Sequence, residues 1–133
     1  MILTAKDFET TDYDQDVLKA EYTYNGTEIT IALYNGENNI DEILVDIDEV
    51  VSNLASYDER GKRLIIDELY DAYNEDEALT EEEFKSQIGL LSLYFTGDKE
   101  AEFMYEGGDI FGGHFLAIEL KDGFFEDGVA VEG

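Results

Sequence analysis

Alternation of apolar and polar residues predicts a β-hairpin near the start of the chain. Two alternating, aromatic-rich runs, over 18–24 and 28–34, flank Asn25-Gly26. Asn-Gly favours a type I′ turn, because both central residues of that turn need a positive φ. We therefore expect two antiparallel strands that are joined by a tight turn.

A helical period follows the hairpin. Apolar residues recur at spacings of three and four from Ile40 to Leu54, and acidic residues occupy the intervening positions. This pattern predicts an amphipathic helix. Asn39 precedes it and Glu42 lies three residues further on, which is the spacing of a capping box.

Two more helices are expected after the first. A stripe of apolar residues predicts a helix over 58–74, with Ser56 or Asp58 as its N-cap. A short third helix is expected after Thr80, because Glu83 follows it at the capping-box spacing.

The remainder of the chain changes to a strand pattern. Turns that contain glycine separate four runs of strand character, over 88–96, 100–106, 110–121 and 128–132. A strand pair, then helices, then a run of strands indicates an α+β fold. We expect an antiparallel sheet, formed by the N-terminal hairpin and a C-terminal meander, with two to three helices packed on one face. Because the chain contains no Pro, linker or repeat, 1–133 is expected to form a single domain.

Charge changes this picture more than any motif. Asp and Glu number 34 against 8 Lys and Arg, which gives a formal net charge of −26. The acidic residues gather in two stretches without a base, between Lys19 and Arg60 and between Arg63 and Lys85. Such a surface repels nucleic acid and anionic lipid and attracts basic proteins. Arg60, Lys62 and Arg63 lie together at the unfavourable end of the second expected helix, which suggests an acidic partner within the fold.

The function that this charge favours is binding. We expect a cytoplasmic monomer that neutralises a basic protein partner, as an immunity protein or a nucleic-acid-mimicking inhibitor does, without a cofactor, metal or membrane span. Two alternatives stay open, namely an interaction domain whose charge serves only solubility and an enzyme. The acidic residues expected to bind are Asp41, Glu42, Asp46, Glu49, Asp67, Glu68, Asp71, Glu75, Asp76 and Glu77.

Candidate catalytic chemistry is sparse. The chain has no Cys, which excludes disulfides and thiolate catalysis, and its one His excludes any site that needs two. His114 is the residue around which an enzyme site would form, together with nearby carboxylates. Asp12-x-Asp14-x-Asp16 begins like a calcium loop, but Val17 and Thr23 replace the Gly and Glu that an EF-hand needs.

Aromatic residues are expected mainly in the core. The exceptions that we consider are exposed anchors of an acidic, aromatic binding surface, a role that such residues have in many interfaces. The candidates are Tyr94, Tyr105 and Phe124-Phe125.

Several short features of the second half of the chain occur together in one family. They are Asn74 after an amphipathic helix, Thr80-x-x-x-Phe84, Phe103 and Tyr105 in a strand-turn-strand, Gly108-Asp109-Ile110-Phe111, Gly113-His114, and the final Val129 to Gly133. From Tyr73 onward the chain resembles a bacterial family known as domain of unknown function 2262, which is similar to domain of unknown function 2004. With the hairpin and two helices, the likeness covers nearly the whole domain.

That resemblance implies an α+β fold and no assigned activity. It makes Asn74 and His114 the first residues to test. The family usually has a Trp shortly after the Asn and another before the Gly-His, and here those places hold Glu75 to Glu77 and Gly112.

Overall fold

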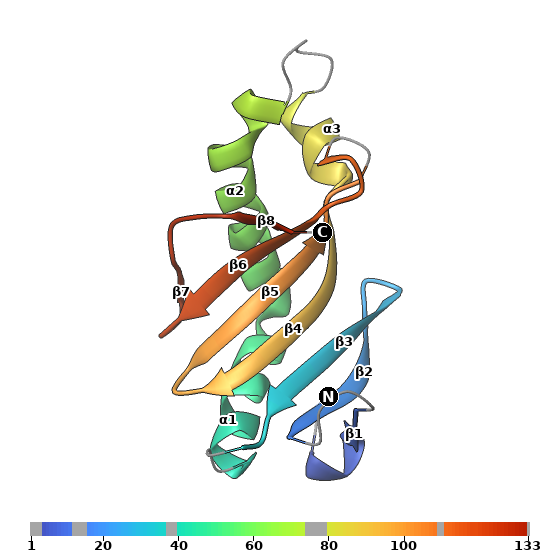
Figure 1. Cartoon of the computed structure of the whole chain (residues 1–133), viewed down its shortest axis with the longest axis vertical. Helices are drawn as coiled ribbons and strands as arrows, with labels where there is room; N and C mark the ends of the chain where they lie inside the picture. The colour runs from blue at the N-terminus through green and yellow to red at the C-terminus, as the bar shows by residue number, and fades with distance from the viewer. Residues whose placement is uncertain (1–3, 12–15, 37–39, 74–79, 109–110, 133) are drawn as a thin grey trace.

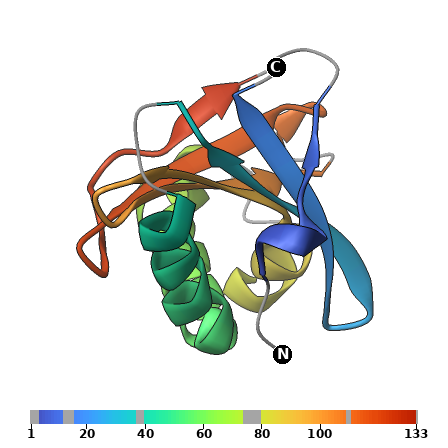
Figure 2. The same cartoon turned by 90° about the horizontal axis from the view of Figure 1, so that it is seen from below.

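A mixed β-sheet with its helices on one face forms the fold (Figures 1 and 2). The computed structural model describes residues 4–11, 16–36, 40–73, 80–108 and 111–132. Its elements are η1 (Ala5–Asp7), β1 (Glu9–Thr10), β2 (Val17–Tyr24), β3 (Thr27–Tyr34), α1 (Ile40–Ser52), α2 (Leu54–Tyr73), α3 (Glu81–Ser86), β4 (Gly89–Gly97), β5 (Glu100–Glu106), β6 (Phe115–Lys121), β7 (Phe124–Phe125) and β8 (Ala130–Glu132).

The predicted hairpin is confirmed. β2 and β3 pair antiparallel along their whole length, from Val17 opposite Tyr34 to Tyr24 opposite Thr27. Asn25 and Gly26 both have positive φ, 50° and 78°, as a type I′ turn requires.

The α+β class and the hairpin-plus-meander layout are also confirmed. The strand order is β1-β2-β3-β4-β5-β6-β7, and β8 pairs with β6. The one difference from the expected antiparallel sheet is the junction, where β3 and β4 pair in parallel. Parallel neighbours need a long crossover, and the segment that contains α1, α2 and α3 supplies it.

The helices differ from the prediction at one boundary. α2 begins at Leu54, because the amides of Ser56 and Tyr57 both donate to the carbonyl of Asn53 and start a new helical turn there. Neither Ser56 nor Asp58 is therefore an N-cap, and Asp58 is buried within the helix. The Asn39 cap predicted for α1 lies outside the described residues.

The predicted capping box of α3 is confirmed. The Glu83 amide donates to Thr80 Oγ1 at 3.1 Å, and the Thr80 amide donates to Glu83 Oε1 at 3.0 Å. Phe84, which follows directly, is fully buried.

The predicted strand over 110–121 is too long at its start. Gly112 and Gly113 have φ of 61° and 83°, and the Gly113 amide donates to the Gly108 carbonyl. This turn keeps the chain out of the sheet until Phe115. The pattern also did not predict the two-residue strands β1 and β7.

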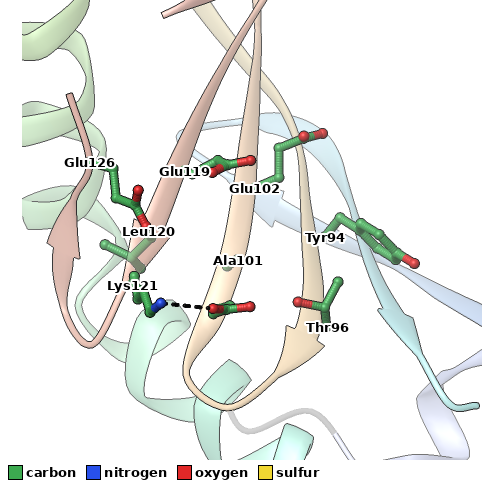
Figure 3. Close-up of a pocket in the computed structure, with 9 residues that line it drawn as sticks. Tyr94, Thr96, Ala101, Glu102, Glu119, Leu120, Lys121 and Glu126 are labelled. Carbon is green, nitrogen blue, oxygen red and sulfur yellow. Dashed lines mark ion pairs between the residues drawn. The ribbon is translucent and has the colours of Figure 1, made fainter. Parts of the chain in front are cut away.

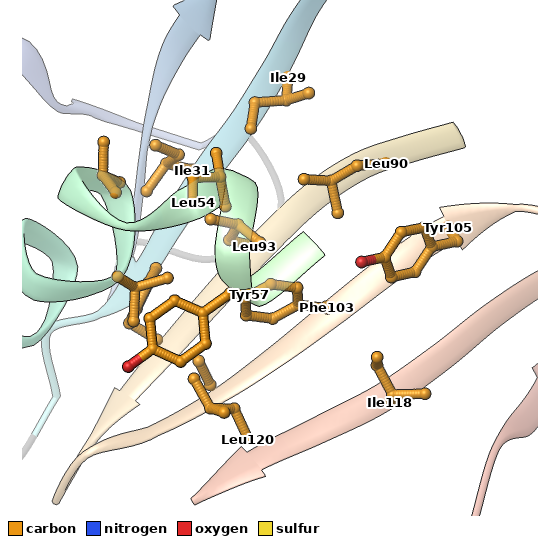
Figure 4. Packing of buried hydrophobic residues seen from close by; sticks show 14 of the residues in the cluster. Ile29, Ile31, Leu54, Tyr57, Leu90, Leu93, Phe103, Tyr105, Ile118 and Leu120 are labelled. Carbon is orange, nitrogen blue, oxygen red and sulfur yellow. The ribbon is translucent and has the colours of Figure 1, made fainter. Parts of the chain in front are cut away.

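The core lies between the helices and the inner face of the sheet (Figure 4). Alternation along the strands turns one set of side chains inward, and the fully buried side chains include Ile31 of β3, Leu93 of β4, Phe103 of β5 and Ile118 of β6. The opposite set faces away from the helices. We call this second surface the outer sheet face, and below we use its part on β4–β8.

Candidate functional site

Two bases of the patch on α2, Lys62 and Arg63, lie against carboxylates of the fold. Arg63 donates to Asp67 through Nε at 2.9 Å and Nη2 at 2.8 Å, and its Nη1 lies 3.1 Å from Glu81 Oε1. These bonds raise the pKa of Arg63. Lys85 pairs with Glu59 and lowers the pKa of that carboxyl. The acidic partners that the sequence suggested for this patch are therefore its own neighbours.

Asp58 is an acid of the fold and not of the surface. Its side chain accepts hydrogen bonds from Tyr24 Oη and Tyr105 Oη, each at 2.9 Å, and Lys62 Nζ lies 3.6 Å away. Burial, followed by the hydrogen bond and charge of Asp58, raises the pKa of Tyr24 to about 12. Tyr105 is fully buried, so its predicted role as an exposed anchor is wrong.

Two of the nominated acids on α1 make local contacts. Asp46 accepts a hydrogen bond from the Lys99 amide at 3.1 Å, although burial raises the pKa of this carboxyl. Glu49 accepts a hydrogen bond from Tyr57 Oη at 3.4 Å. Both acids therefore contribute to packing between α1 and its neighbours.

Glu68 on α2 holds the C-terminal segment. Its two carboxylate oxygens accept hydrogen bonds from the amides of Gly128 and Val129, at 2.8 and 3.2 Å. These contacts position the chain just before β8 and fix that strand at the edge of the sheet.

The other nominated acids are exposed on the helices or lie outside the described part of the chain. Asp41, Glu42 and Asp71 are exposed on the helices. Asn74 and residues 75–77 lie outside the described part of the chain, as do residues 12–15 of the considered calcium loop. The described nominated acids therefore lie on α1 and α2, and their role in binding stays a prediction.

A different group of acids meets on the outer sheet face. A hollow of about 200 Å³ crosses β4, β5 and β6, and Figure 3 shows its side chains. Its lining consists of Tyr94, Thr96, Glu100, Ala101, Glu102, Glu119, Leu120, Lys121 and Glu126. The hollow therefore has acidic and aromatic walls.

Register explains why these acids are close together. Glu102 pairs with Tyr94 on one side and with Glu119 on the other. Side chains directly opposite in an antiparallel pair have Cβ atoms roughly 5 Å apart, and like charges there are destabilising. Burial, followed by the charges of Glu132 and Glu119, raises the pKa of Glu102. The cation among the residues that line the hollow, Lys121, lies 3.5 Å from Glu100 in an ion pair.

Exposed aromatic side chains flank this acidic group. Phe124 is 73% exposed and pairs with Lys121, so it lies at one end of the outer sheet face. Phe115 is 41% exposed and pairs with Glu106 and Glu132 towards the other end. The predicted anchors Tyr94 and Phe124 therefore belong to this surface. Phe125 instead packs inward, with its ring 5.1 Å from that of Phe103.

His114 lies apart from this surface hollow. It is exposed in the turn before β6, where its amide donates to the Phe111 carbonyl at 3.1 Å. Among the described residues, no group of three or more His, Asp or Glu side chains is placed to hold a metal ion. No helix of the described chain is long and apolar enough to cross a bilayer.

The sequence did contain a signal for the residues that were missed. Glu100, Glu102 and Glu106 alternate with inward-facing apolar residues, and Glu119 sits between Ile118 and Leu120 in the same way. Acids at every second position of a strand share one face. The pairing of Glu102 with Glu119, however, depends on register between strands, which this alternation does not fix.

Comparison with known proteins gives one match. A family model described as an uncharacterised protein conserved in bacteria, DUF2262, matches residues 8–124. No curated protein and no solved structure matches the chain.

Proposed function

Because the chain belongs to the DUF2262 family, whose description assigns no activity, we propose a function from its surface: it binds and neutralises a basic protein partner through the outer sheet face. The observation that carries this proposal is the direct pairing of Glu102 with Glu119, next to Glu132 and flanked by exposed aromatic side chains. This combination suits a cationic protein surface.

Charge complementarity supports this choice of partner. A cationic side chain placed between Glu102 and Glu119 relieves their mutual repulsion, so binding gains energy that the free protein lacks. The net charge of −26 adds long-range attraction for a basic protein and repels nucleic acid. Affinity should therefore fall as salt rises, because exposed charges are screened over about 8 Å at physiological ionic strength.

The aromatic residues support a protein partner over a small cation. Phe124 and Phe115 present large apolar areas to solvent at the two ends of the acidic group, and aromatic anchors carry much of the energy in protein interfaces. An immunity-type inhibitor of a basic toxin and a nucleic-acid-mimicking inhibitor both bind such a partner. Repulsion between copies favours action as a monomer.

The test compares two variants of equal net charge. Glu102→Gln/Glu119→Gln removes two charges from the outer sheet face, and Asp41→Asn/Glu42→Gln removes two from α1. A basic protein captured by the wild-type chain from native lysate at low salt is purified, and its affinity for all three proteins is measured. We expect the sheet variant to lose at least about tenfold in affinity, or about 1.4 kcal/mol, and the α1 variant to stay close to wild type.

Equal losses in the two variants would contradict the proposal, because net charge and not the outer sheet face would then determine binding. Failure to capture any basic protein at low salt would contradict it as well. A loss of affinity in the α1 variant alone would also contradict it, because the acids of α1 and not those of the outer sheet face would then bind the partner.

A further inference from the structure

One edge of the sheet is only partly covered. β1 pairs with β2 at two positions, Glu9 opposite Lys19 and Thr10 opposite Leu18, and β2 continues to Tyr24. Among the described residues, no strand pairs with this edge beyond Lys19. A bare strand edge presents unpaired backbone donors and acceptors to another chain.

Phe8 explains why the covering strand is so short. Its side chain is buried in the core, and the preceding residues form η1 instead of extending β1. The chain therefore approaches the edge from the helix side of the sheet (Figure 2) and joins it only at Glu9. As a consequence of this core contact, no described strand covers the remaining length of β2.

The backbone groups at the bare edge can be identified. The Thr11 amide donates to the Val17 carbonyl, which shows that Val17 directs its backbone groups towards β1. This orientation repeats at every second residue of an antiparallel strand. Lys19 therefore also faces β1, and Glu21 and Thr23 direct their N–H and C=O groups to the uncovered edge.

A second hollow adjoins the start of β1. It has a volume of about 180 Å³ and is lined by Asp7, Glu9, Lys19, Ala20 and Glu21. Three carboxylates against one ammonium group give it a net negative charge. Glu21 faces the outer side of the sheet, where it lies within 3.4 Å of Thr30 Oγ1.

We propose that this edge takes up an extended, basic segment of a partner protein as an additional strand, antiparallel to β2 and in line with β1. The backbone of the segment pairs with Glu21 and Thr23, and a Lys or Arg side chain enters the acidic hollow. Backbone pairing gives affinity in this mode of recognition and side-chain pockets give specificity. A second copy of the chain is a poor occupant, because each copy carries a charge of −26.

This inference is independent of the function proposed above, because the uncovered edge lies on β2 and the acidic aromatic surface lies on β4–β8. The probe is a capped synthetic peptide of alternating Arg and Val, and the control peptide has the same sequence with alternate backbone amides methylated. The control keeps the charge but cannot pair as a strand. Amide hydrogen exchange of the full chain is measured with each peptide.

We expect the unmodified peptide to slow exchange at the Glu21 and Thr23 amides at least about tenfold, in proportion to the bound fraction. The methylated peptide should leave both amides unchanged. Thr23→Pro removes one of the edge donors, and Thr23→Ala keeps it, so the first should bind at least about tenfold more weakly than the second. If Thr23→Pro does not fold, the two peptides on the wild-type chain decide the question.

Three results would overturn the inference. The two peptides could bind equally, which would show attraction by charge alone. The protected amides could lie on β4–β6. Glu102→Gln/Glu119→Gln could abolish the protection of Glu21 and Thr23. If that variant keeps this protection, the edge acts on its own, whatever the outcome of the test of the outer sheet face.

Discussion

Carboxylates on the helical side of this protein and on its outer sheet face are in opposite situations. On α2 and α3, Asp67 and Glu81 share Arg63, and Glu59 pairs with Lys85. On the outer sheet face, Glu102 instead lies opposite Glu119. These three helical acids therefore have cations within the fold, whereas Glu102 and Glu119 repel one another until a cation arrives from outside.

This contrast shows that the density of acids along a sequence does not tell which of them have a cation within the fold. The two acid-rich stretches without a base map largely onto the hairpin and the helices, where several acids have structural partners. The acids best placed for an external cation come from β5, β6 and β8, and they are separated in sequence. The positions of neighbouring cations in the fold distinguish the two groups of acids, and amino-acid composition does not.

The largest effect on stability is expected when Asp58, the buried acid of α2, is replaced. Asp58→Ala removes the acceptor shared by Tyr24 and Tyr105. One buried and one half-buried hydroxyl group without a partner should lower the free energy of unfolding by about 2–4 kcal/mol. Urea unfolding measures this loss, and the exposed Asp71→Asn, expected within about 0.5 kcal/mol of wild type, is its control. A loss no larger than that of the control would show that Asp58 is not a structural acid.

Gly61→Ala tests the close contact that brings Tyr105 to Asp58. A Cβ at this position would lie 2.8 Å from both Tyr105 Oη and Ile118 Cδ1. Crowding of a packed core costs about 1–3 kcal/mol, and the higher helix propensity of Ala returns about 1 kcal/mol. We expect a net loss of about 1 kcal/mol in urea unfolding, with Ser56→Ala as the exposed control on the same helix. A more stable Gly61→Ala would contradict this packing.

Replacing Glu102 on the sheet should have a smaller effect on stability, and of the opposite sign. Glu102→Gln removes one of two paired like charges and should raise the free energy of unfolding by a few tenths of a kcal/mol, up to about 1 kcal/mol, at neutral pH. Asp67→Asn on α2 loses an ion pair with Arg63 and should lower it slightly. Changes of the same sign in both variants would remove the contrast between the two regions.

The gain from Glu102→Gln should depend on pH. The folded-state pKa of Glu102 is raised above its ordinary value of 4.5, so the folded chain holds this proton more tightly than the unfolded chain. Ionised Glu102 therefore lowers the free energy of unfolding of the wild-type chain at pH values above the raised pKa. This destabilisation disappears as the pH falls through the raised pKa towards 4.5. Chemical unfolding across that range should show the advantage of the variant shrinking, and a constant advantage would contradict the assigned cause.

The smallest effect is expected at the exposed cation of α2. Arg63→Gln leaves Asp67 and Glu81 without their shared partner, but all three side chains are exposed. A slight loss of thermal stability at low salt should disappear at high salt, because exposed ion pairs are screened. A loss that persists at high salt would show that Arg63 acts through packing.

Local signals predicted much of the fold. Asn25-Gly26 located the hairpin turn, and Thr80 with Glu83 located the start of α3, because each motif satisfies its own backbone groups within a few residues. The parallel junction of β3 and β4 has no such local signal. The start of α2 was missed because a turn at Asn53, without a capping motif, separates it from α1.

The candidate site was harder to predict for the same reason. Tyr94 and Phe124 were nominated from their residue type alone. The closeness of Glu102, Glu119 and Glu132 arises from the pairing of β5, β6 and β8, which brings together residues up to 30 positions apart in the sequence. Asp58 was predicted only as a possible N-cap, because its hydrogen-bond partners are two tyrosines from distant strands.

The most direct test of the central claim is a map of the bound surface. Amide chemical shifts of the isotope-labelled chain are recorded with and without the captured basic partner. We predict that the perturbed residues lie on the outer sheet face of β4–β8, around Tyr94, Glu102, Glu119 and Phe124. Perturbations confined to α1 and α2, or spread evenly over every acidic surface, would contradict the account.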